Sequence, residues 1–364
     1  MTGTKPNNDE ETAFSSKEIA QAIADIADQK GTEERLRAIG SQSPAHHEQV
    51  IIALIAALEH PNTIIVSKAA YFLTSIFGPE ERAVEPLIKL LAKPDPIVQR
   101  IAAHALAESG DPRAFEPLLA ILSYPDGSVN DVIAWALAKL GDPRAAEPLI
   151  AVLVDPDGYV SLEVIAALGT LRDPRAVEPL IAVLSDPDNS VRWNAIESLW
   201  EIKDGRATEP LIRMLSDPDM HVRRNAVNAL GSLGDARAVD PLISMLSDAN
   251  SVIRFEVIHA LWNIGLDARV VEPLARALTD PDDLVKRDAA FTLAWFGDAR
   301  AVIPLITRLV SPYENVRRGA SHALGKLGDP RALEPLRALL ADSSEQVRQE
   351  AQKAIEEINR RSNY

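Results

Sequence analysis

The chain has 364 residues, of which 46% are hydrophobic and 5% aromatic, and 53 acidic against 38 Lys and Arg side chains give a formal net charge of −15. Because like charges repel, this balance disfavours nucleic acid and anionic lipid as partners. The absence of cysteine excludes disulfides, thiolate metal ligands and a cysteine nucleophile. Abundant Ala and Leu, with little β-branched alternation, predict an all-α protein.

The N-terminal segment lacks the pattern of a core element. Residues 1–16, MTGTKPNNDEETAFSS, contain no apolar stretch of the kind found in a signal peptide, and we predict a disordered tail. Residues 17–45 are expected to form one or two capping helices. No stretch reaches the roughly 18 apolar residues that a membrane span requires. The sequence therefore predicts a cytoplasmic protein without membrane insertion.

From residue 46 onward a repeat organises the sequence. Pro-Leu recurs at steps of 31 or 32 residues, with the prolines at Pro86, Pro117, Pro148, Pro179, Pro210, Pro241, Pro273, Pro304 and Pro335. A Val or Ile lies twelve residues beyond each proline, and a Leu or Ile lies eight residues further on. Residues 46–77 carry Ala53, Ile65 and Leu73 at these three positions, which predicts a degenerate tenth repeat.

Each repeat is expected to form two helices. An aspartate before Pro-Arg-Ala or Ala-Arg-Ala caps the first helix, helix A; these aspartates are Asp111, Asp142, Asp173, Asp235 and Asp329. The proline six residues later, such as Pro148, is expected to kink helix A. The second helix, helix B, starts near the repeated Val and ends at a glycine such as Gly141, which suits a left-handed C-cap.

One such hairpin cannot bury its apolar face alone, so neighbouring hairpins must stack. The period and the wording DPRAVEPLIAVLSDPDNSVR resemble HEAT repeats, in particular the HEAT-like repeat shared with phycobilin lyase subunits. The resemblance covers residues 46–361 and implies a right-handed α-solenoid, or superhelix, of about ten two-helix repeats. Residues 362–364 remain as a C-terminal tail.

The resemblance also implies a stacked ladder of acidic and basic side chains six residues apart. The pairs are Asp186/Arg192, Asp217/Arg223, Asp248/Arg254, Asp280/Lys286 and Asp342/Arg348. Earlier repeats carry Lys93/Gln99, Tyr124/Asn130 and Asp155/Ser161 instead, so we expect the ladder to be lost there. The N-terminal repeats should then deform more easily than the later ones.

The polar residues form no recognisable catalytic pattern. The chain carries no phosphate-binding loop, nucleophile elbow or paired-carboxylate motif, and its repeated carboxylates fit caps and turns. The HEAT-repeat enzyme that hydroxylates deoxyhypusine uses several His-Glu pairs, whereas only His47-Glu48 occurs here. His104, His259 and His322 share one helix-B position in distant repeats, which is too far apart for one metal ion. We expect no metal.

Aromatic side chains depart from the repeat, and all five tryptophans fall in helix B. They either fill space between repeats or form a patch on the concave side, which helix B lines in HEAT-like arrays. Trp200, Phe255 and Trp262 lie on one stripe of helix B beside the Ala and Leu positions of the core. The candidate partner-binding residues are Trp135, Trp193, Glu197, Trp200, Arg224, Phe255, His259, Trp262, Arg287, Phe291 and Trp295.

These features predict a non-enzymatic scaffold or adaptor that grips a client protein with its concave helix-B face and needs no cofactor. The resemblance implies an alternative, a subunit of a phycobilin lyase or lyase-isomerase, or a phycobilisome assembly or degradation factor. The transferred ligand would then be a phycobilin and the client a phycobiliprotein. A DNA-repair enzyme of the HEAT type is disfavoured by the acidic charge.

Overall fold

The computed structural model describes residue 38 and residues 44–78, 80–122, 129–154, 160–265 and 268–362. The predicted tail 1–16 lies outside these residues, as do nearly all of the predicted capping segment 17–45 and the last two residues of the predicted C-terminal tail. The chain divides into two compact units, Met1–Pro179 and Leu180–Tyr364. Within the described residues the regular secondary structure is entirely helical, which confirms the predicted fold class.

Unit 1 contains the earlier helix pairs. They are α3 (Pro44–Ala57) with α4 (Thr63–Tyr71), α5 (Glu81–Leu91) with α6 (Pro96–Ser109), α7 (Phe115–Leu122) with α8 (Asn130–Leu140), and α9 (Ala146–Leu153) with α10 (Leu162–Leu171). A π-helical turn at Phe72–Ile76 continues α4. The boundary between the units falls inside α11 (Val177–Ala182).

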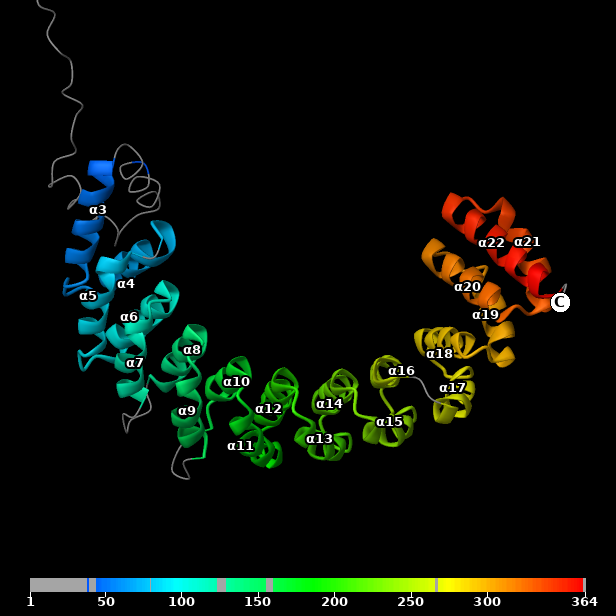
Figure 1. Cartoon of the computed structure of the whole chain (residues 1–364), viewed down its shortest axis with the longest axis horizontal. Coiled ribbons are helices and arrows are strands. Elements are labelled where there is room, and N and C mark those ends of the chain that lie inside the picture. Colours follow the sequence, from blue (N-terminus) through cyan, green and yellow to red (C-terminus); the bar gives the residue numbers. More distant parts are fainter. Residues whose placement is uncertain are drawn as a thin grey trace, which may run out of the picture. The chain divides into compact units, whose positions relative to one another are not determined.

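Unit 2 contains the later helices. After α11 come α12 (Asn189–Ile202), α13 (Thr208–Met214), α14 (Met220–Leu233), α15 (Val239–Met245), α16 (Ser251–Ile264), α17 (Val271–Ala277), α18 (Asp283–Trp295), α19 (Val302–Arg308), α20 (Glu314–Leu327), α21 (Leu333–Ala338) and α22 (Glu345–Ser362). In each unit the even-numbered helices, which are the predicted helices B, pack on one another in a row, and the odd-numbered helices A form a second row beside them (Figure 1). The described residues thus contain ten helix pairs, as the repeat predicts.

The predicted caps are confirmed. Asp142 accepts the backbone N–H of Arg144 and opens a 3-10 turn at Pro143–Ala145, from which α9 continues. The four equivalent aspartates before the other Pro-Arg-Ala and Ala-Arg-Ala sequences do the same. Pro148 lies in the first turn of α9, which begins at Ala146 directly after the 3-10 turn, and the kink expected at the proline stays a prediction. Gly141 ends α8 at φ 71°, a left-handed conformation that glycine adopts without strain.

The repeat positions form the core. The leucine of every Pro-Leu dipeptide from Leu87 to Leu336 is fully buried, and so is nearly every leucine near the end of helix B, such as Leu230. Each buried leucine contributes about 1.5–3 kcal/mol relative to an exposed one. Neighbouring helices B also approach closely, because a Cβ on Gly231 in α14 would lie 2.7 Å from the Cα of Ala260 in α16. The repeated sequence thus specifies the stacking directly.

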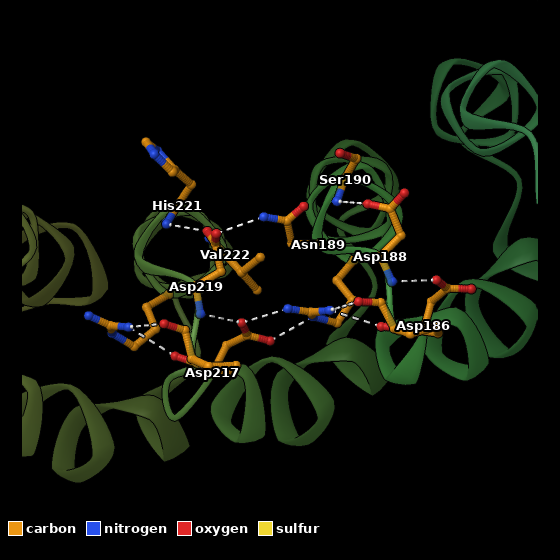
Figure 2. A network of polar contacts seen from close by, with 12 residues as sticks. Asp186, Asp188, Asn189, Ser190, Asp217, Asp219, His221 and Val222 are labelled. Atoms are coloured by element: carbon orange, nitrogen blue, oxygen red, sulfur yellow. Dashed lines mark hydrogen bonds and ion pairs between the residues drawn. The ribbon is translucent and has the colours of Figure 1, made fainter.

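The predicted ladder is present in unit 2, but its ion pairs join neighbouring repeats. They are Arg192–Asp217, Arg223–Asp248, Arg254–Asp280 and Arg317–Asp342, at 2.7–2.8 Å, with side chains at most 18% exposed. The aspartate six residues earlier, which was the predicted partner, is contacted only through its backbone. Arg192, for example, donates a hydrogen bond to the carbonyl oxygen of Asp186. Figure 2 shows one junction, where Asp217 caps its own turn at Asp219 and Asn189 reaches Asp219 across the repeat boundary.

One rung of this ladder is missing inside unit 2. Lys286 and Ser311 occupy the Arg and Asp positions between α18 and α20. Lys286 pairs with Asp283 instead, whose carboxylate is 73% exposed and also contacts Arg308 at 3.4 Å. Exposed pairs of this kind contribute about 0–1 kcal/mol. The junction between α18 and α20 is therefore less firmly held on the helix-B side than its neighbours.

A second row of arginines, which the sequence analysis missed, links the helices A. Five arginines of the Asp-Pro-Arg type contact both their own capping aspartate and an acidic residue of the preceding repeat; they are Arg113, Arg144, Arg175, Arg237 and Arg300. Arg144 contacts Glu116 at 2.8 Å, and Arg300 contacts Glu272 at 2.6 Å. This row occurs in both units, including the N-terminal repeats that lack the first ladder. Its arginines are 42–62% exposed, so each link is weak in water.

Within the part of the chain that the structure describes, no helix has both the length and the apolar character needed to cross a bilayer.

Candidate aromatic binding site

Five of the predicted site residues meet at one pocket of unit 2. The pocket lies on α16, α18 and α20 and has a volume of about 490 Å³. Its lining residues, here called the aromatic pocket, are Ile258, His259, Trp262, Arg287, Asp288, Phe291, Thr292, Ala294, Trp295, His322, Ala323 and Lys326. This volume is typical of sites that hold a small molecule or a few side chains of a partner, about 300–1,000 Å³.

Two tryptophans form the exposed wall of the aromatic pocket. Trp262, near the end of α16, and Trp295, at the end of α18, meet edge to face with ring centroids 5.2 Å apart. They remain 42% and 66% exposed. The core positions of both helices are already filled by the repeated Ala and Leu, so these larger side chains have no buried place to occupy. They therefore present apolar surface to solvent.

Phe291 forms the inner wall. A Cβ on Gly319 in α20 would lie 3.1 Å from Cζ of Phe291, so a side chain at position 319 would push against the ring. Gly319 thus leaves room for the phenylalanine between α18 and α20. Its backbone φ is not in the left-handed region, and the close approach is what favours glycine here.

A charged cluster borders the aromatic wall. Asp288 accepts a hydrogen bond from Arg287 Nε at 2.6 Å and lies 2.9 Å from His259 Nε2. Burial raises the pKa of Asp288, but the hydrogen bonds from His259 and Arg287 outweigh burial and keep that pKa below its usual value. The hydrogen bond to Asp288 raises the pKa of His259, with partial burial acting in the opposite direction. Both carboxylate oxygens of Asp288 are therefore occupied.

Two further basic residues on α20, His322 and Lys326, complete the lining. His322 Nδ1 lies 2.8 Å from a carboxylate oxygen of Glu350 in α22. Lys326 is exposed, and its ammonium group makes no ion pair within the described residues. The aromatic pocket thus combines an apolar wall with more basic than acidic side chains.

Two other predicted residues adjoin this pocket through His259. The ring of Phe255 lies 4.6 Å from that of His259 on α16. Trp200 of α12 is half-buried and lines a second cavity of about 500 Å³ with Glu256, His259 and Gly231. The predicted stripe therefore continues from α12 to α18, although its tryptophans become more exposed toward α18.

The remaining predicted residues lie elsewhere. Trp193 and Glu197 are half-buried on α12, and Arg224 is exposed on α14. Trp135 belongs to unit 1, where its ring stacks on His104 at 4.8 Å and lies beneath Lys139 Nζ at 5.0 Å. Together with Lys139 and Glu163 it lines a separate cavity of about 330 Å³.

Sequence reasoning missed Asp288, His322 and Lys326. A signal was available for the last two, since His322 occupies the repeat position of His259 and Phe291, and Lys326 occupies that of Trp295. In the sequence, His322 stands out only as a candidate metal ligand. Among the described residues no three His, Asp or Glu side chains gather as a potential metal site.

A family model of HEAT repeats matches residues 51–129, 84–169, 115–187, 146–224, 177–262, 208–288 and 271–356. No curated protein matches the chain.

Several solved structures are similar. The X-ray structure of YibA from Escherichia coli has 19% identity and a TM-score of 0.50, covering 83% of this chain and 98% of that one. An engineered protein has 23% identity and a TM-score of 0.45, covering 94% and 98%. The complex of CpcE and CpcF of phycocyanin lyase from Nostoc sp. PCC7120 has 23% identity and a TM-score of 0.39, covering 62% and 92%.

At these identities a structural likeness concerns the fold alone. The family model is the stronger finding, because its matches together span residues 51–356 and coincide with the helix pairs of both units. The repeat identified from the sequence is thereby confirmed. The chain belongs to the family of HEAT-repeat proteins.

Proposed function

We propose that this HEAT-repeat scaffold is a non-enzymatic adaptor and that unit 2 grips a client protein at the aromatic pocket. The observation that carries the proposal is the exposure of Trp262 and Trp295 beside a cavity. Tryptophan is enriched at the centres of protein interfaces, where a partner covers its large apolar surface. A folded chain gains nothing in stability from leaving two such rings in water.

The supporting argument for a protein partner is chemical. The pocket offers an apolar wall of two rings set edge to face, with hydrogen-bonding groups beside it, which suits a side chain presented by another protein. The net charge of −15 disfavours nucleic acid, because a phosphate backbone would meet a repulsive field. We also propose that the adaptor needs no cofactor.

The test is a Trp262→Ala, Trp295→Ala double variant. A client is first captured from the source cell and identified by mass spectrometry, and its affinity is then measured for the purified wild type and variants. If the two tryptophans anchor the client, the double variant should bind it more weakly by about 2 kcal/mol or more. The unfolding free energy should fall by only about 1–2 kcal/mol, because the variant removes one contact between two partly exposed rings.

Tyr313→Ala is the matched control, since Tyr313 is an aromatic residue that is 69% exposed and does not line the pocket. It should leave client affinity unchanged. A loss of about 3–5 kcal/mol in stability of the tryptophan variant, with unaltered binding, would instead identify the tryptophans as packing groups and refute the proposal.

The phycobilin alternative rests on the same pocket, whose aromatic walls and Arg287 suit an open-chain tetrapyrrole. Co-expression with bilin synthesis distinguishes the two proposals. Visible absorbance that stays with the purified protein, and is lost in the tryptophan double variant, would favour a lyase subunit. A colourless protein that still binds its client would favour the adaptor.

A further inference from the structure

This inference rests on the proposed function and specifies the chemistry of the bound segment. We propose that the aromatic pocket recognises an acidic segment of a partner protein, with an aromatic side chain against Trp262, Trp295 and Phe291 and a neighbouring carboxylate at Lys326 and Arg287. The preference follows from the balance of charged groups around the pocket.

The first step is the state of the acidic lining. Among the described lining residues, Asp288 alone carries a carboxylate, and its side chain is only 13% exposed. One oxygen accepts from Arg287, and the other lies within hydrogen-bonding distance of His259. A lysine or arginine of a partner would therefore find its natural counter-ion already occupied. It would also meet the positive charges of Lys326 and Arg287.

The second step is the supply of donors for an anion. Arg287 uses Nε for Asp288, which leaves its terminal amino groups without a hydrogen bond within the described residues. Lys326, which is exposed, lines the same pocket from α20. His322 is already engaged with Glu350 through Nδ1 and is not counted among these donors. A carboxylate would gain charge-assisted hydrogen bonds from Arg287 and Lys326.

The third step concerns the aromatic part of the ligand. The edge-to-face arrangement of Trp262 and Trp295 leaves ring surface of both residues exposed to a third ring. Aromatic pairs prefer such edge-to-face or offset contacts at centroid distances of about 4.5–7 Å. A segment that carries both an aromatic ring and a carboxylate satisfies both parts of the pocket.

The charge preference is local. The chain as a whole is strongly acidic, so its long-range field repels an acidic partner. A preference for anionic ligands must then come from direct contacts at the pocket, and it should disappear when Lys326 is replaced. A long-range attraction between the whole chain and the ligand would not depend on this one residue.

A matched pair of dyes measures the preference. 8-Anilinonaphthalene-1-sulfonate and N-phenyl-1-naphthylamine share one ring system, and only the first carries a negative charge. We expect the anionic dye to bind the wild type about 3- to 10-fold more tightly, as befits a partly exposed ion pair. Lys326→Ala should reduce this ratio to about 2 or less without weakening the neutral dye, and Lys326→Glu should invert it.

Lys139→Ala is the control, because Lys139 lies over Trp135 in unit 1 and does not line the aromatic pocket. It should leave the ratio unchanged. Short peptides then identify the partner class by displacing the anionic dye. The peptide acetyl-Gly-Glu-Glu-Trp-Glu-Glu-Gly-amide should displace the dye at a lower concentration than the two peptides in which Gln or Lys replaces every Glu.

The outcomes separate the two proposals. If neither dye responds to Trp262→Ala, Trp295→Ala, the pocket does not bind aromatic groups, and the proposed function fails together with the inference. If the tryptophan variant loses both dyes but the Lys326 variants keep the wild-type ratio, only the charge preference is overturned. Displacement by the Lys peptide at equal or lower concentration overturns it as well. Circular dichroism of every variant checks that folding is retained.

Discussion

Replacing Asp280 by alanine tests whether the buried ladder holds the repeats of unit 2 together. Asp280 accepts two hydrogen bonds from Arg254, from Nε and Nη2, each at 2.7 Å, and one from the backbone N–H of Asp282 at 2.8 Å. The side chains of Arg254 and Asp280 are only 10% and 8% exposed. The variant would leave the guanidinium group buried without its counter-ion.

Breaking a buried pair in this way costs about 3–5 kcal/mol. Arg254 keeps the carbonyl oxygens of Asp248 and Ala249 as acceptors, at 2.8 and 3.3 Å, which argues for the lower end. The lost bond to the N–H of Asp282 adds about 1 kcal/mol. We therefore expect a loss of about 3–4 kcal/mol in the free energy that holds α16 and α18 together.

The assay is urea unfolding combined with hydrogen exchange of α16 and α18, because an array with nearest-neighbour contacts can open locally. Glu272→Ala is the control, since it breaks the exposed pair with Arg300 and should cost about 1 kcal/mol or less. If Asp280→Ala costs no more than Glu272→Ala, the ladder does not stabilise the stack.

Acid supplies a second check on the same residue. Hydrogen bonds from Arg254 lower the pKa of Asp280, and burial opposes them more weakly. A lowered folded-state pKa means that the stabilisation is present above the unfolded value of about 3.9 and is lost as the pH falls through the folded pKa. The difference between wild type and Asp280→Ala should therefore shrink in acid. A difference that stays constant from pH 7 to pH 2 would refute the reasoning.

Three further predictions concern other parts of the chain. Lys203 ends α12 at φ 58°, where glycine avoids the steric cost, so Lys203→Gly should stabilise the protein by about 0.5–1 kcal/mol in thermal melting, and a lower melting temperature would contradict this. Because its pKa is raised by Asp288, His259 should stabilise unit 2 fully below about pH 6.5 and lose that contribution as the pH rises through the folded value; His259→Gln should remove the dependence. Helices α6 and α8, which lack the buried ladder, should exchange amide hydrogens faster than α14 and α16, and slower exchange would count against the ladder as the cause.

Much of the fold could be predicted because the repeat encodes it locally. An aspartate before Pro-Arg-Ala, a Pro-Leu in helix A and a glycine after helix B each act on neighbouring residues, so Asp142, Leu149 and Gly141 have the predicted roles. The direction of the ladder could not be predicted in the same way. Asp186 and Asp217 stand at equivalent positions in successive repeats, and spacing alone cannot tell which of them Arg192 reaches.

The candidate site was predictable only in outline. The sequence indicated helix-B aromatic and charged residues, and the structure brings five of these candidates together on α16 and α18. It could not indicate that Trp135 lies in the other unit, or that Lys326 faces the same cavity as Trp295 from the next repeat. Such neighbours depend on how far each helix is offset from the next. The 31-residue spacing shows which residues occupy equivalent positions in different repeats, but it does not determine the offset between neighbouring helices.

The missing rung between α18 and α20 has a mechanical consequence. On the helix-A side this junction keeps the contact between Arg300 and Glu272, whereas Lys286 and Ser311 give the helix-B side no buried pair. A stretching force along the stack of unit 2 is therefore expected to part this junction first, with the helix-A side as its axis. The aromatic pocket lies across the same junction, so pulling would change the shape of the pocket before any repeat unfolds. Single-molecule extension with and without a bound ligand would detect this coupling as a ligand-dependent first opening force.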